Sequence, residues 1–392
     1  MTPSARLQAA IEIVDEVVAA AQAGGAAADT LIARYFKTRR YAGSKDRRAV
    51  RELAYAAIRR AGERPVSGRA ALIGLTDQMP ELANLFDGSN NCPAPIGDEP
   101  VARAGVAPAW LEEKLLATLD ADELPALLER APLDLRVNRL KASREDVLSE
   151  LPDALPGNLS RDALHLPEGS RIEAMPAFLE GRVEVQDEGS QLIVDACAVA
   201  PDMIVVDLCA GAGGKTLGLA AAMAGRGRLI ACDVDRQRLS RLAPRAERAG
   251  ATSIETRLLD GGRQAAALAD LAGQADVVLI DAPCSGTGTW RRNPEARWRL
   301  TPERLARLRA MQAHVLTLGA PLVKPGGRLV YAVCSLLDEE GRNQAEAFLA
   351  ANPGWTAIDP LPAGRPHGPG RRLTPAHDGS DGFFIAVLAR TC

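Results

Sequence analysis

The stretch that decides the fold is MIVVDLCAGAGGKT, which runs from Met203 to Thr216. Four apolar residues precede Asp207, and the glycines that follow permit a tight turn and a close approach of a ligand to the backbone. A helical pattern begins near Lys215. This order of strand, glycine-rich turn and helix is typical of an α/β unit that binds a nucleotide-like ligand.

Later apolar runs extend the same pattern toward the C-terminus. They are RLIACD from Arg228, DVVLID from Asp276 and GRLVYAVC from Gly327. Short apolar runs that alternate with helical stretches predict an α/β fold with a doubly wound, Rossmann-like parallel sheet. In such sheets ligands bind beyond the carboxyl ends of the strands, so the residues that end these runs are expected at one rim. These residues are Cys209, Asp233, Asp281 and Cys334.

The N-terminal part of the chain has a different pattern. Apolar residues with helical spacing lie at positions 7, 11, 14 and 18, and residues 48–60 show a second helical pattern. We therefore predict an all-helical domain over residues 1–90.

Between these regions the chain is predicted to contain a linker and a small module. Residues 91–107 belong to a stretch rich in proline and glycine, which is typical of a linker. Residues 108–180 are expected to form a small α+β module, with a strand over 135–140 and a helix capped at Ser143. The sheet domain then takes residues 181–392.

The composition is that of an ordinary globular protein. Of 392 residues, 47% are hydrophobic and 25% are charged, and the formal net charge is −3. No run approaches the roughly 20 apolar residues of a membrane helix, and acidic residues lie where a signal peptide would have its apolar core. We expect a cytoplasmic protein without a membrane partner. The seven cysteines lie far apart, which predicts neither a disulfide framework nor a metal site.

The glycine-rich turn and the acid at the next strand end together indicate a nucleoside cofactor. Asp233 lies twenty residues after Gly213, where a carboxylate would accept hydrogen bonds from ribose hydroxyls. Thr216 replaces the small residue of a dinucleotide fingerprint, and the turn is too short for a phosphate-binding loop. S-adenosylmethionine (SAM) has no pyrophosphate and requires only the close approach and the acidic anchor, so SAM is the predicted cofactor.

Two of the cysteines are candidates for catalysis. Most cysteines are small core residues, and Cys197 and Cys232 lie in apolar runs that fit this interpretation. Cys92 and Cys392 are interpreted as incidental surface or tail residues. Cys284 and Cys334 differ because each directly follows a strand and precedes a serine. Cys284 lies in the segment DAPCSGTGTWRRNPE, which begins at Asp281, and Cys334 lies in YAVCSL, which begins at Tyr331.

A thiolate beside a SAM methyl group suits methylation of a pyrimidine at C5. This carbon is too weakly nucleophilic to react until a sulfur adds to C6, and such covalent catalysis requires a thiolate. Asp281 is placed to hydrogen-bond or protonate the base as charge develops. Acyl transfer fits less well, because no histidine lies near either cysteine in the sequence.

These motifs resemble the RsmB/NOP2/Sun family of RNA cytosine-C5 methyltransferases. The resemblance rests on QDEGSQL from Gln186, DLCAGAGGKT from Asp207, ACDVD from Ala231 and KPGGRLVYAVCSL from Lys324, together with the Asp281 segment. It covers residues 180–392 and implies that Cys334 is the nucleophile and Cys284 the release residue. Family members often have Ala-Ala-Pro-Gly-Gly-Lys where this chain has AGAGGK from Ala210. The implied cofactor contacts are Cys209, Ala210, Gly211, Ala212, Gly213, Gly214, Lys215, Asp233, Asp260 and Asp281.

RNA is the expected substrate, and 16S ribosomal RNA is favoured by the resemblance. Residues 34–48 contain seven basic residues and one acid with Tyr35, Phe36 and Tyr41 between them, which is typical of a phosphate-contacting surface or of a solvated helix face. SKDRRAVRELAYAAIRR from Ser44 resembles a shortened NusB-like RNA-binding domain. A second RNA contact is expected at RRNPEARWR from Arg291. The residues proposed there are Arg291, Arg292 and Arg297, with Trp290 or Trp298 as a stacking face.

Three alternatives stay open from the sequence. The chain could be a noncatalytic RNA-binding ribosome assembly factor, it could act on tRNA, or it could use SAM to modify proteins or small molecules. The cysteines, Asp281 and the glycine-rich turn favour an enzyme over the first alternative. A monomer is expected.

Overall fold

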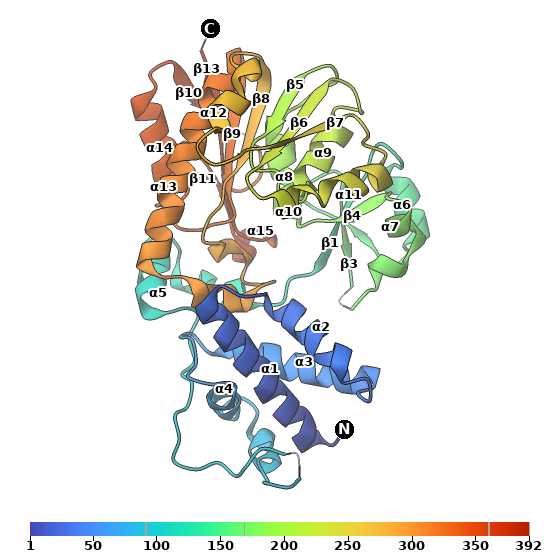
Figure 1. Cartoon of the computed structure of the whole chain (residues 1–392), viewed down its shortest axis with the longest axis vertical. Coiled ribbons are helices and arrows are strands. Elements are labelled where there is room, and N and C mark those ends of the chain that lie inside the picture. The colour runs from blue at the N-terminus through green and yellow to red at the C-terminus, as the bar shows by residue number, and fades with distance from the viewer. Residues whose placement is uncertain (91, 168, 360, 392) are drawn as a thin grey trace. The chain divides into compact units, whose positions relative to one another are not determined.

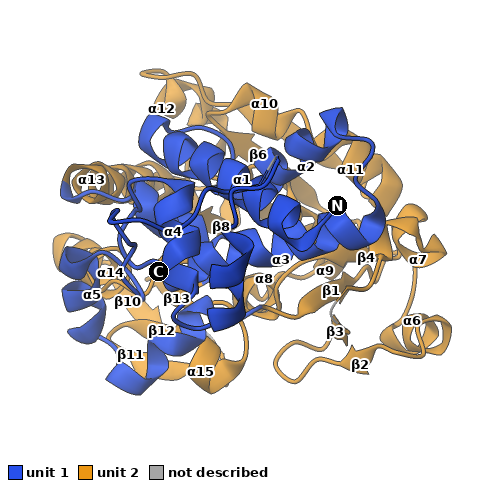
Figure 2. Ribbon diagram, turned by 90° about the horizontal axis from the view of Figure 1, so that it is seen from below, with its two compact units in different colours: residues 1–130, 289–302 blue, residues 131–288, 303–392 orange. Residues whose placement is uncertain are grey.

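The computed structural model describes residues 1–90, 92–167, 169–359 and 361–391. Cys392 and Asn91, the first residue of the predicted linker, lie outside the described residues. The chain separates into two compact units, coloured in Figure 2. One contains residues 1–130 and 289–302 and is called the helical unit here. The other contains residues 131–288 and 303–392 and is called the sheet unit.

This division differs from the predicted segments. The boundary falls at residue 130, after the predicted linker, and the predicted sheet domain contributes residues 289–302 to the helical unit. Compactness depends on contacts between distant segments, and a composition shift along the chain does not report them. The predicted division into residues 1–90, 91–107, 108–180 and 181–392 follows sequence patterns and stays a prediction.

The helical unit confirms the predicted N-terminal helices. Its helices are α1 (Pro3–Ala23), α2 (Ala28–Thr38), α3 (Ser44–Arg60), α4 (Gly68–Leu75) and α5 (Ala109–Leu116). Short 3₁₀ segments cover Pro80–Leu85, Ala121–Glu123, Pro125–Leu128 and Pro294–Arg299. The apolar stripe of α1 packs on α3 and α4, with Leu7 and Val14 fully buried. Burial of this stripe is what stabilises the helices.

A small antiparallel sheet opens the sheet unit. Its order is β2-β3-β1-β4, and its strands are β1 (Leu133–Val137), β2 (Leu155–Pro156), β3 (Ala163–Leu166) and β4 (Val183–Val185). Helix α6 (Arg144–Glu150) begins after its predicted cap, Ser143, which accepts a hydrogen bond from the Asp146 N–H. A short helix, α7, covers Pro176–Leu179. Strand β1 ends before the predicted Leu140 because the Asn138 side chain accepts from the Leu140 N–H and turns the chain.

The large sheet is nine-stranded and confirms the predicted Rossmann-like α/β fold. Its order is β11-β12-β13-β9-β8-β5-β6-β7, with β10 paired to β13. The strands from β7 to β9 in this order are parallel. They are β5 (Ile204–Asp207), β6 (Arg228–Asp233), β7 (Ile254–Leu258), β8 (Ala275–Asp281) and β9 (Val323–Val333).

Helices cover both faces of this sheet, as Figure 1 shows. Alternate residues of each strand point to opposite faces, so Val205 and Val206 enter different cores. On one face lie α8 (Glu188–Cys197), α9 (Gly214–Ala222) and α11 (Leu242–Ala249). On the other lie α13 (Pro302–Gly319) and α14 (Arg342–Ala351). Shorter helices are α10 (Arg236–Leu239), α12 (Gln264–Ala267) and α15 (Pro375–Asp378).

The C-terminal strands add an antiparallel part that the sequence patterns did not predict. They are β10 (Trp355–Ile358), β11 (Arg365–His367), β12 (Gly370–Leu373) and β13 (Phe383–Arg390). Strand β13 pairs antiparallel with β9 along six residue pairs, so β9, which carries Cys334 at its end, lies between two strands. This placement makes the backbone that leads to Cys334 an interior part of the sheet.

Candidate functional site

The strand ends of the sheet unit surround one cavity of about 260 Å³. Several predicted site residues line it: Cys209, Ala210, Ala212, Gly214, Lys215 and Asp281. Residues that were not predicted also line it: Val185, Gln186, Ser190, Asp207, Arg238 and Arg245. Of the four residues predicted to share one rim, Cys209 and Asp281 line this cavity, whereas Asp233 and Cys334 are not among its lining residues. Arg238 and Arg245 give the cavity basic side chains that the sequence did not indicate.

Two glycines of the turn after β5 are required by its geometry. Gly211 and Gly213 have positive φ angles of 56° and 83°. A Cβ at Gly211 would lie 2.4 Å from the Arg238 guanidinium, and one at Gly213 would lie 2.0 Å from the Leu242 side chain. The turn without a family proline is thus held by glycine conformation and close packing.

Asp207 lines the cavity, and only one of its two carboxylate oxygens has a hydrogen-bond partner among the described residues. Its Oδ2 accepts a hydrogen bond of 2.6 Å from the Thr216 hydroxyl. Its Oδ1 is buried and has no hydrogen-bond partner among the described residues. Burial raises the pKa of Asp207 to about 7. An acceptor in this position suits a ligand that brings a donor or a positive charge.

Asp233 and Asp260 are not among the residues that line the cavity. The buried Asp233 carboxylate accepts hydrogen bonds of 2.7 Å from the Gly211 N–H and from the Asp235 N–H. Asp233 therefore stabilises the glycine turn through the Gly211 N–H. Asp260 is exposed after the end of β7. Their predicted contacts with a cofactor stay predictions.

Lys215 and Asp281 form an ion pair at the rim. The Lys215 Nζ lies 2.6 Å from the Asp281 Oδ2. Burial acts to lower the pKa of Lys215, but the attraction of Asp281 outweighs it and raises this pKa, so the amine stays protonated. Lys215 also interacts electrostatically with Cys334. The pair thus joins the glycine turn to the strand ends that carry the thiols.

The two predicted cysteines are in contact. The Cys284 and Cys334 Sγ atoms lie 3.3 Å apart, although the residues are fifty positions apart in the sequence. The hydrogen bond to Cys334, together with burial, raises the pKa of the Cys284 thiol well above its usual range. Cys284 therefore keeps its proton at neutral pH. Cys197 and Cys232 are buried core residues, as predicted.

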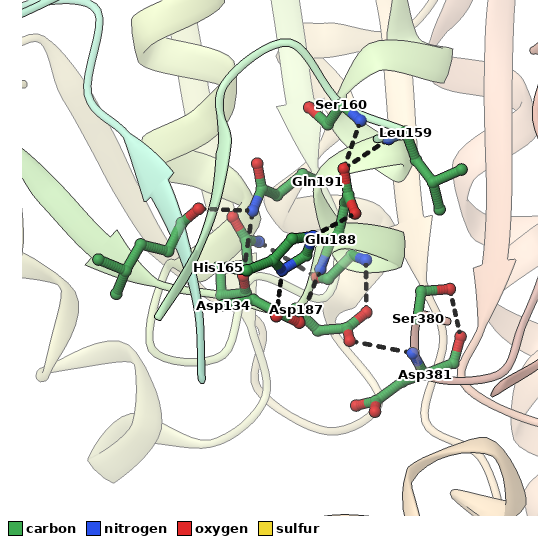
Figure 3. A network of polar contacts seen from close by, with 12 residues as sticks. Asp134, Leu159, Ser160, His165, Asp187, Glu188, Gln191, Ser380 and Asp381 are labelled. Atoms are coloured by element: carbon green, nitrogen blue, oxygen red, sulfur yellow. Dashed lines mark hydrogen bonds and ion pairs between the residues drawn. The ribbon is translucent and has the colours of Figure 1, made fainter. Parts of the chain in front are cut away.

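Residues of the QDEGSQL segment connect the small sheet to the cavity. Figure 3 shows His165 between two carboxylates, with its Nδ1 2.8 Å from Asp134 and its Nε2 3.1 Å from Glu188. These hydrogen bonds raise the pKa of His165 to about 10. Asp187 accepts from the Ser190 N–H at the start of α8 and from the Asp381 N–H before β13.

Arg136 extends this connection to the glycine turn. Its guanidinium, which is buried, donates to the Gln186 side chain and, over 2.8 Å, to the Gly214 carbonyl. Burial lowers the pKa of Arg136 to about 10. Arg136 lies in LRVNRLK from Leu135, which resembles a segment of the RsmB/NOP2/Sun family, but the sequence did not predict its contact with Gly214, which is 78 residues away. Gln186 could have been predicted as a site residue from the sequence, since it is the first residue of the QDEGSQL motif that carries the family resemblance.

The stretch 34–48 is only partly the surface that was expected. Its arginines and lysines are mostly exposed, and Tyr41 is 74% exposed. Tyr35 and Phe36 instead belong to the core of the helical unit. Tyr41 is thus the one aromatic residue of this stretch with an accessible ring.

The expected RNA contacts of the second basic segment are wrong for most of its residues. Trp290, Trp298, Arg291 and Arg297 are all buried. Arg297 is fully buried, and its guanidinium donates to the carbonyls of Ile58, Arg59, Ala61 and Pro294. Trp298 packs in the core of the helical unit. Composition could not separate this segment from an exposed basic one.

None of the helices in the described residues is long and apolar enough to cross a membrane. Among the same residues, no group of three or more histidine, cysteine, aspartate or glutamate side chains could hold a metal ion.

Comparison with known proteins identifies the family. The family model described as 16S rRNA methyltransferase RsmB/F matches residues 194–389. The chain belongs to this family. The RsmB/F match begins in α8 and ends in β13, so it includes the glycine turn, both thiols and most of the residues that line the cavity. It confirms the predicted membership.

Individual relatives agree with the RsmB/F assignment. The chain is 36% identical over 302 residues to the probable ribosomal RNA small subunit methyltransferase B of Synechocystis, covering 72% of this chain and 66% of that protein. The chain therefore aligns with about two thirds of this relative's length. A solved methyltransferase homolog protein from Pyrococcus horikoshii is 27% identical with a TM-score of 0.64, covering 73% of this chain and 96% of that one. The crystal structure titled PH0851 has a TM-score of 0.80 at 24% identity and covers 99% of each chain, which supports the fold.

Proposed function

We propose that the protein methylates C5 of a cytosine in RNA, with 16S ribosomal RNA as the substrate and SAM as the cofactor. The observation that carries this proposal is the contact of two thiols, 3.3 Å apart, after the ends of β8 and β9. Asp281, which ends β8, lines the cavity. Membership of the RsmB/F family supports RNA methylation, and the name of the Synechocystis relative supports ribosomal RNA.

The residues around the cavity fit SAM. The glycine turn leaves backbone groups accessible, since a Cβ at Gly214 would meet nothing closer than the Gln186 side chain at 3.9 Å. The orphaned Asp207 Oδ1 would pair with an ammonium group, and Arg238 would offer positive charge to a carboxylate, whereas Arg245 is already paired with Glu184. SAM carries both an ammonium and a carboxylate group. When bound, it would supply the methyl group of the reaction.

In this proposal Cys334 is the nucleophile. Its sulfur adds to C6 of the cytosine, and C5 becomes nucleophilic as an enamine. Asp281, whose carboxylate is held by Lys215, would accept a hydrogen bond from the N4 amino group of the base, and from N3 once N3 carries a proton. The hydrogen bond to Cys334 and burial raise the pKa of Cys284, so Cys284 can donate a hydrogen bond to the neighbouring sulfur. Cys334 is assigned as the attacking sulfur from the resemblance to the RsmB/NOP2/Sun family.

Cys284 would act after methyl transfer. Loss of the C5 proton and departure of the Cys334 sulfur from C6 restore the aromatic base. A second thiol at 3.3 Å is close enough to assist the departing sulfur by hydrogen bonding. Without Cys284 the covalent adduct should form and persist.

Cysteine variants test these roles directly. Cys334→Ala should abolish methylation of 16S rRNA transcribed in vitro and form no adduct on denaturing gels, while calorimetry still detects SAM binding. Cys284→Ala should accumulate protein linked to RNA. Cys92→Ala, at a partly exposed position outside the sheet unit, is the matched control and should behave as the parent protein.

Other outcomes separate the remaining alternatives. An adduct with Cys334→Ala and none with Cys284→Ala would reverse the two roles. Full activity of both variants would exclude covalent catalysis. Methylation of tRNA in preference to 16S rRNA would show that tRNA is the substrate. RNA binding without any methyl transfer would favour a noncatalytic ribosome assembly factor.

A further inference from the structure

The two thiols are carried by two loops that are hydrogen-bonded to each other. One loop follows β8 over residues 283–288, and the other follows β9 over residues 334–341. The Gly288 N–H donates to the Cys334 carbonyl over 3.1 Å, and the Leu336 N–H donates to the Thr287 hydroxyl oxygen over 2.8 Å. The distance between the two sulfurs therefore depends on how these loops are held together.

Glu340 lies between the loops and is fully buried. Its Oε1 accepts hydrogen bonds from the Ser285 N–H, at 2.9 Å, and from the Gln312 side-chain amide, at 3.0 Å. Its Oε2 accepts from the Ser335 hydroxyl, at 2.6 Å, and from the Ser285 hydroxyl. Four donors on one buried carboxyl group satisfy it without a cation and make a rigid junction.

The partners of Glu340 are the residues that adjoin the two cysteines. Ser285 directly follows Cys284, and Ser335 directly follows Cys334. Gln312 of α13 also donates to the carbonyl of Pro283, the residue before Cys284. The Tyr331 hydroxyl donates to the Glu340 carbonyl, which fixes the far end of the β9 loop to its own strand.

We propose that Glu340 is a positioning residue that sets the contact between the Cys284 and Cys334 thiols by holding the serine beside each of them. For its effect on catalysis the inference rests on the proposed function, whereas the thiol contact is a property of the protein alone. Within the described part of the chain Glu340 makes no hydrogen bond to either sulfur, so it acts through Ser285 and Ser335. A displacement of about 1 Å in a reacting group can lower a rate by about 10²-fold.

Cross-linking of the thiols gives a readout that needs neither RNA nor SAM. Diamide takes two electrons and two protons from a pair of thiols, which leaves a disulfide between them. In the full-length protein, limited diamide treatment should link Cys284 to Cys334, as detected by mass spectrometry of the joined peptides. Glu340→Ala should lower the initial rate of this cross-link at least about fivefold, because the serines lose their common acceptor.

Two further variants keep the test decisive if Glu340→Ala does not fold. Glu340→Gln preserves the side-chain shape and an acceptor for the backbone N–H, so cross-linking should recover in part. Ser335→Ala removes one donor beside Cys334 and should slow cross-linking with the fold intact by circular dichroism. Asp338→Asn is the control in the same loop, since Asp338 pairs with His367 instead, and its cross-linking should match the parent protein.

Methylation kinetics complete the experiment. With 16S rRNA transcribed in vitro, Glu340→Ala should lower kcat by about 10²-fold and leave the KM for RNA within about twofold, with partial rescue in Glu340→Gln. Unchanged or faster cross-linking in folded Glu340→Ala and Ser335→Ala would overturn the proposal. Slower cross-linking in a protein whose parent form never methylates RNA would retain the positioning role and reject the proposed function.

Discussion

Residues 34–48 and residues 291–299 both combine arginines with aromatic side chains, and both belong to the helical unit. In the first stretch the side chains of Arg34 and Arg48 are 67% and 81% exposed and pair with nearby glutamates. In the second, Arg297 is fully buried, and its guanidinium donates hydrogen bonds to four backbone carbonyls. The same side chain thus serves as a surface cation in one stretch and as an internal donor in the other.

Side chains of residues 291–299 form hydrogen bonds with backbone groups at the ends of three helices. The Glu295 carboxylate accepts from the Ala28 N–H at the start of α2, and Arg297 donates to carbonyls at the end of α3. Arg299 donates to the Gly25 and Ala26 carbonyls after α1. Helix ends leave N–H and C=O groups without partners inside the helix, and the charges of these side chains oppose the helix dipoles. A basic segment can therefore be structural wherever helix ends converge.

Loss of Arg297 should have the largest effect. Arg297→Ala leaves several buried carbonyls without their donor, and we expect a loss of roughly 3–5 kcal/mol in the stability of the helical unit. Hydrogen exchange of α3 amides measures this loss without assuming that the two units unfold together.

Arg299→Ala is the matched control for this experiment, because Arg299 also donates to two carbonyls but in exposed contacts. Its effect should stay within about 1 kcal/mol. Equal exchange in both variants would remove the distinction between a buried and an exposed guanidinium in this segment.

The exposed stretch should be the one that responds to salt. Lys37, Arg40 and Lys45 are exposed and have no ion pair among the described residues, so they are available to phosphates. Replacing all three by glutamine should reduce affinity for 16S rRNA about tenfold and lower the slope of log affinity against log salt by about 2. Arg64→Gln, an exposed arginine outside the stretch, should leave the slope unchanged. A constant slope in the triple variant would make residues 34–48 a solvated face.

Sequence patterns predicted what depends on local order and missed what depends on distant contacts. The parallel strands β5, β6, β8 and β9 were found because both of their faces are largely buried, which produces continuous apolar runs such as residues 204–206. Strand β7 was not among these apolar runs, because its residues are half-buried or exposed. The thiol pair followed from the rule that strand ends meet at one rim. Strands β11 and β12 were not predicted because RPH and GRRL show no apolar alternation; β12 pairs with β13, and β11 pairs with β12.

Site residues divide in the same way. Cys284 and Cys334 were selected from their positions directly after strands. Arg136 and Glu340 were not, because their partners Gly214 and Ser285 lie 78 and 55 residues away in the sequence. A single sequence shows which residues can do chemistry at a strand end, whereas the side chains that hold them become visible only when the chain is folded.

Loss of Tyr41 should have a smaller effect than loss of Arg297 or of the three basic residues. It tests whether the exposed stretch binds RNA by base stacking in addition to charge. Its ring is accessible, whereas the Tyr35 hydroxyl bonds to Glu12 and its ring lies under the Arg39 guanidinium. If Tyr41 stacks on a base, Tyr41→Ala should weaken binding of 16S rRNA by about 1 kcal/mol, and Tyr41→Phe should retain the affinity. The salt slope should not change, because no cation is removed. Filter binding at several salt concentrations measures both quantities, and a loss of affinity in Tyr41→Phe equal to that in Tyr41→Ala would point to the hydroxyl instead of stacking.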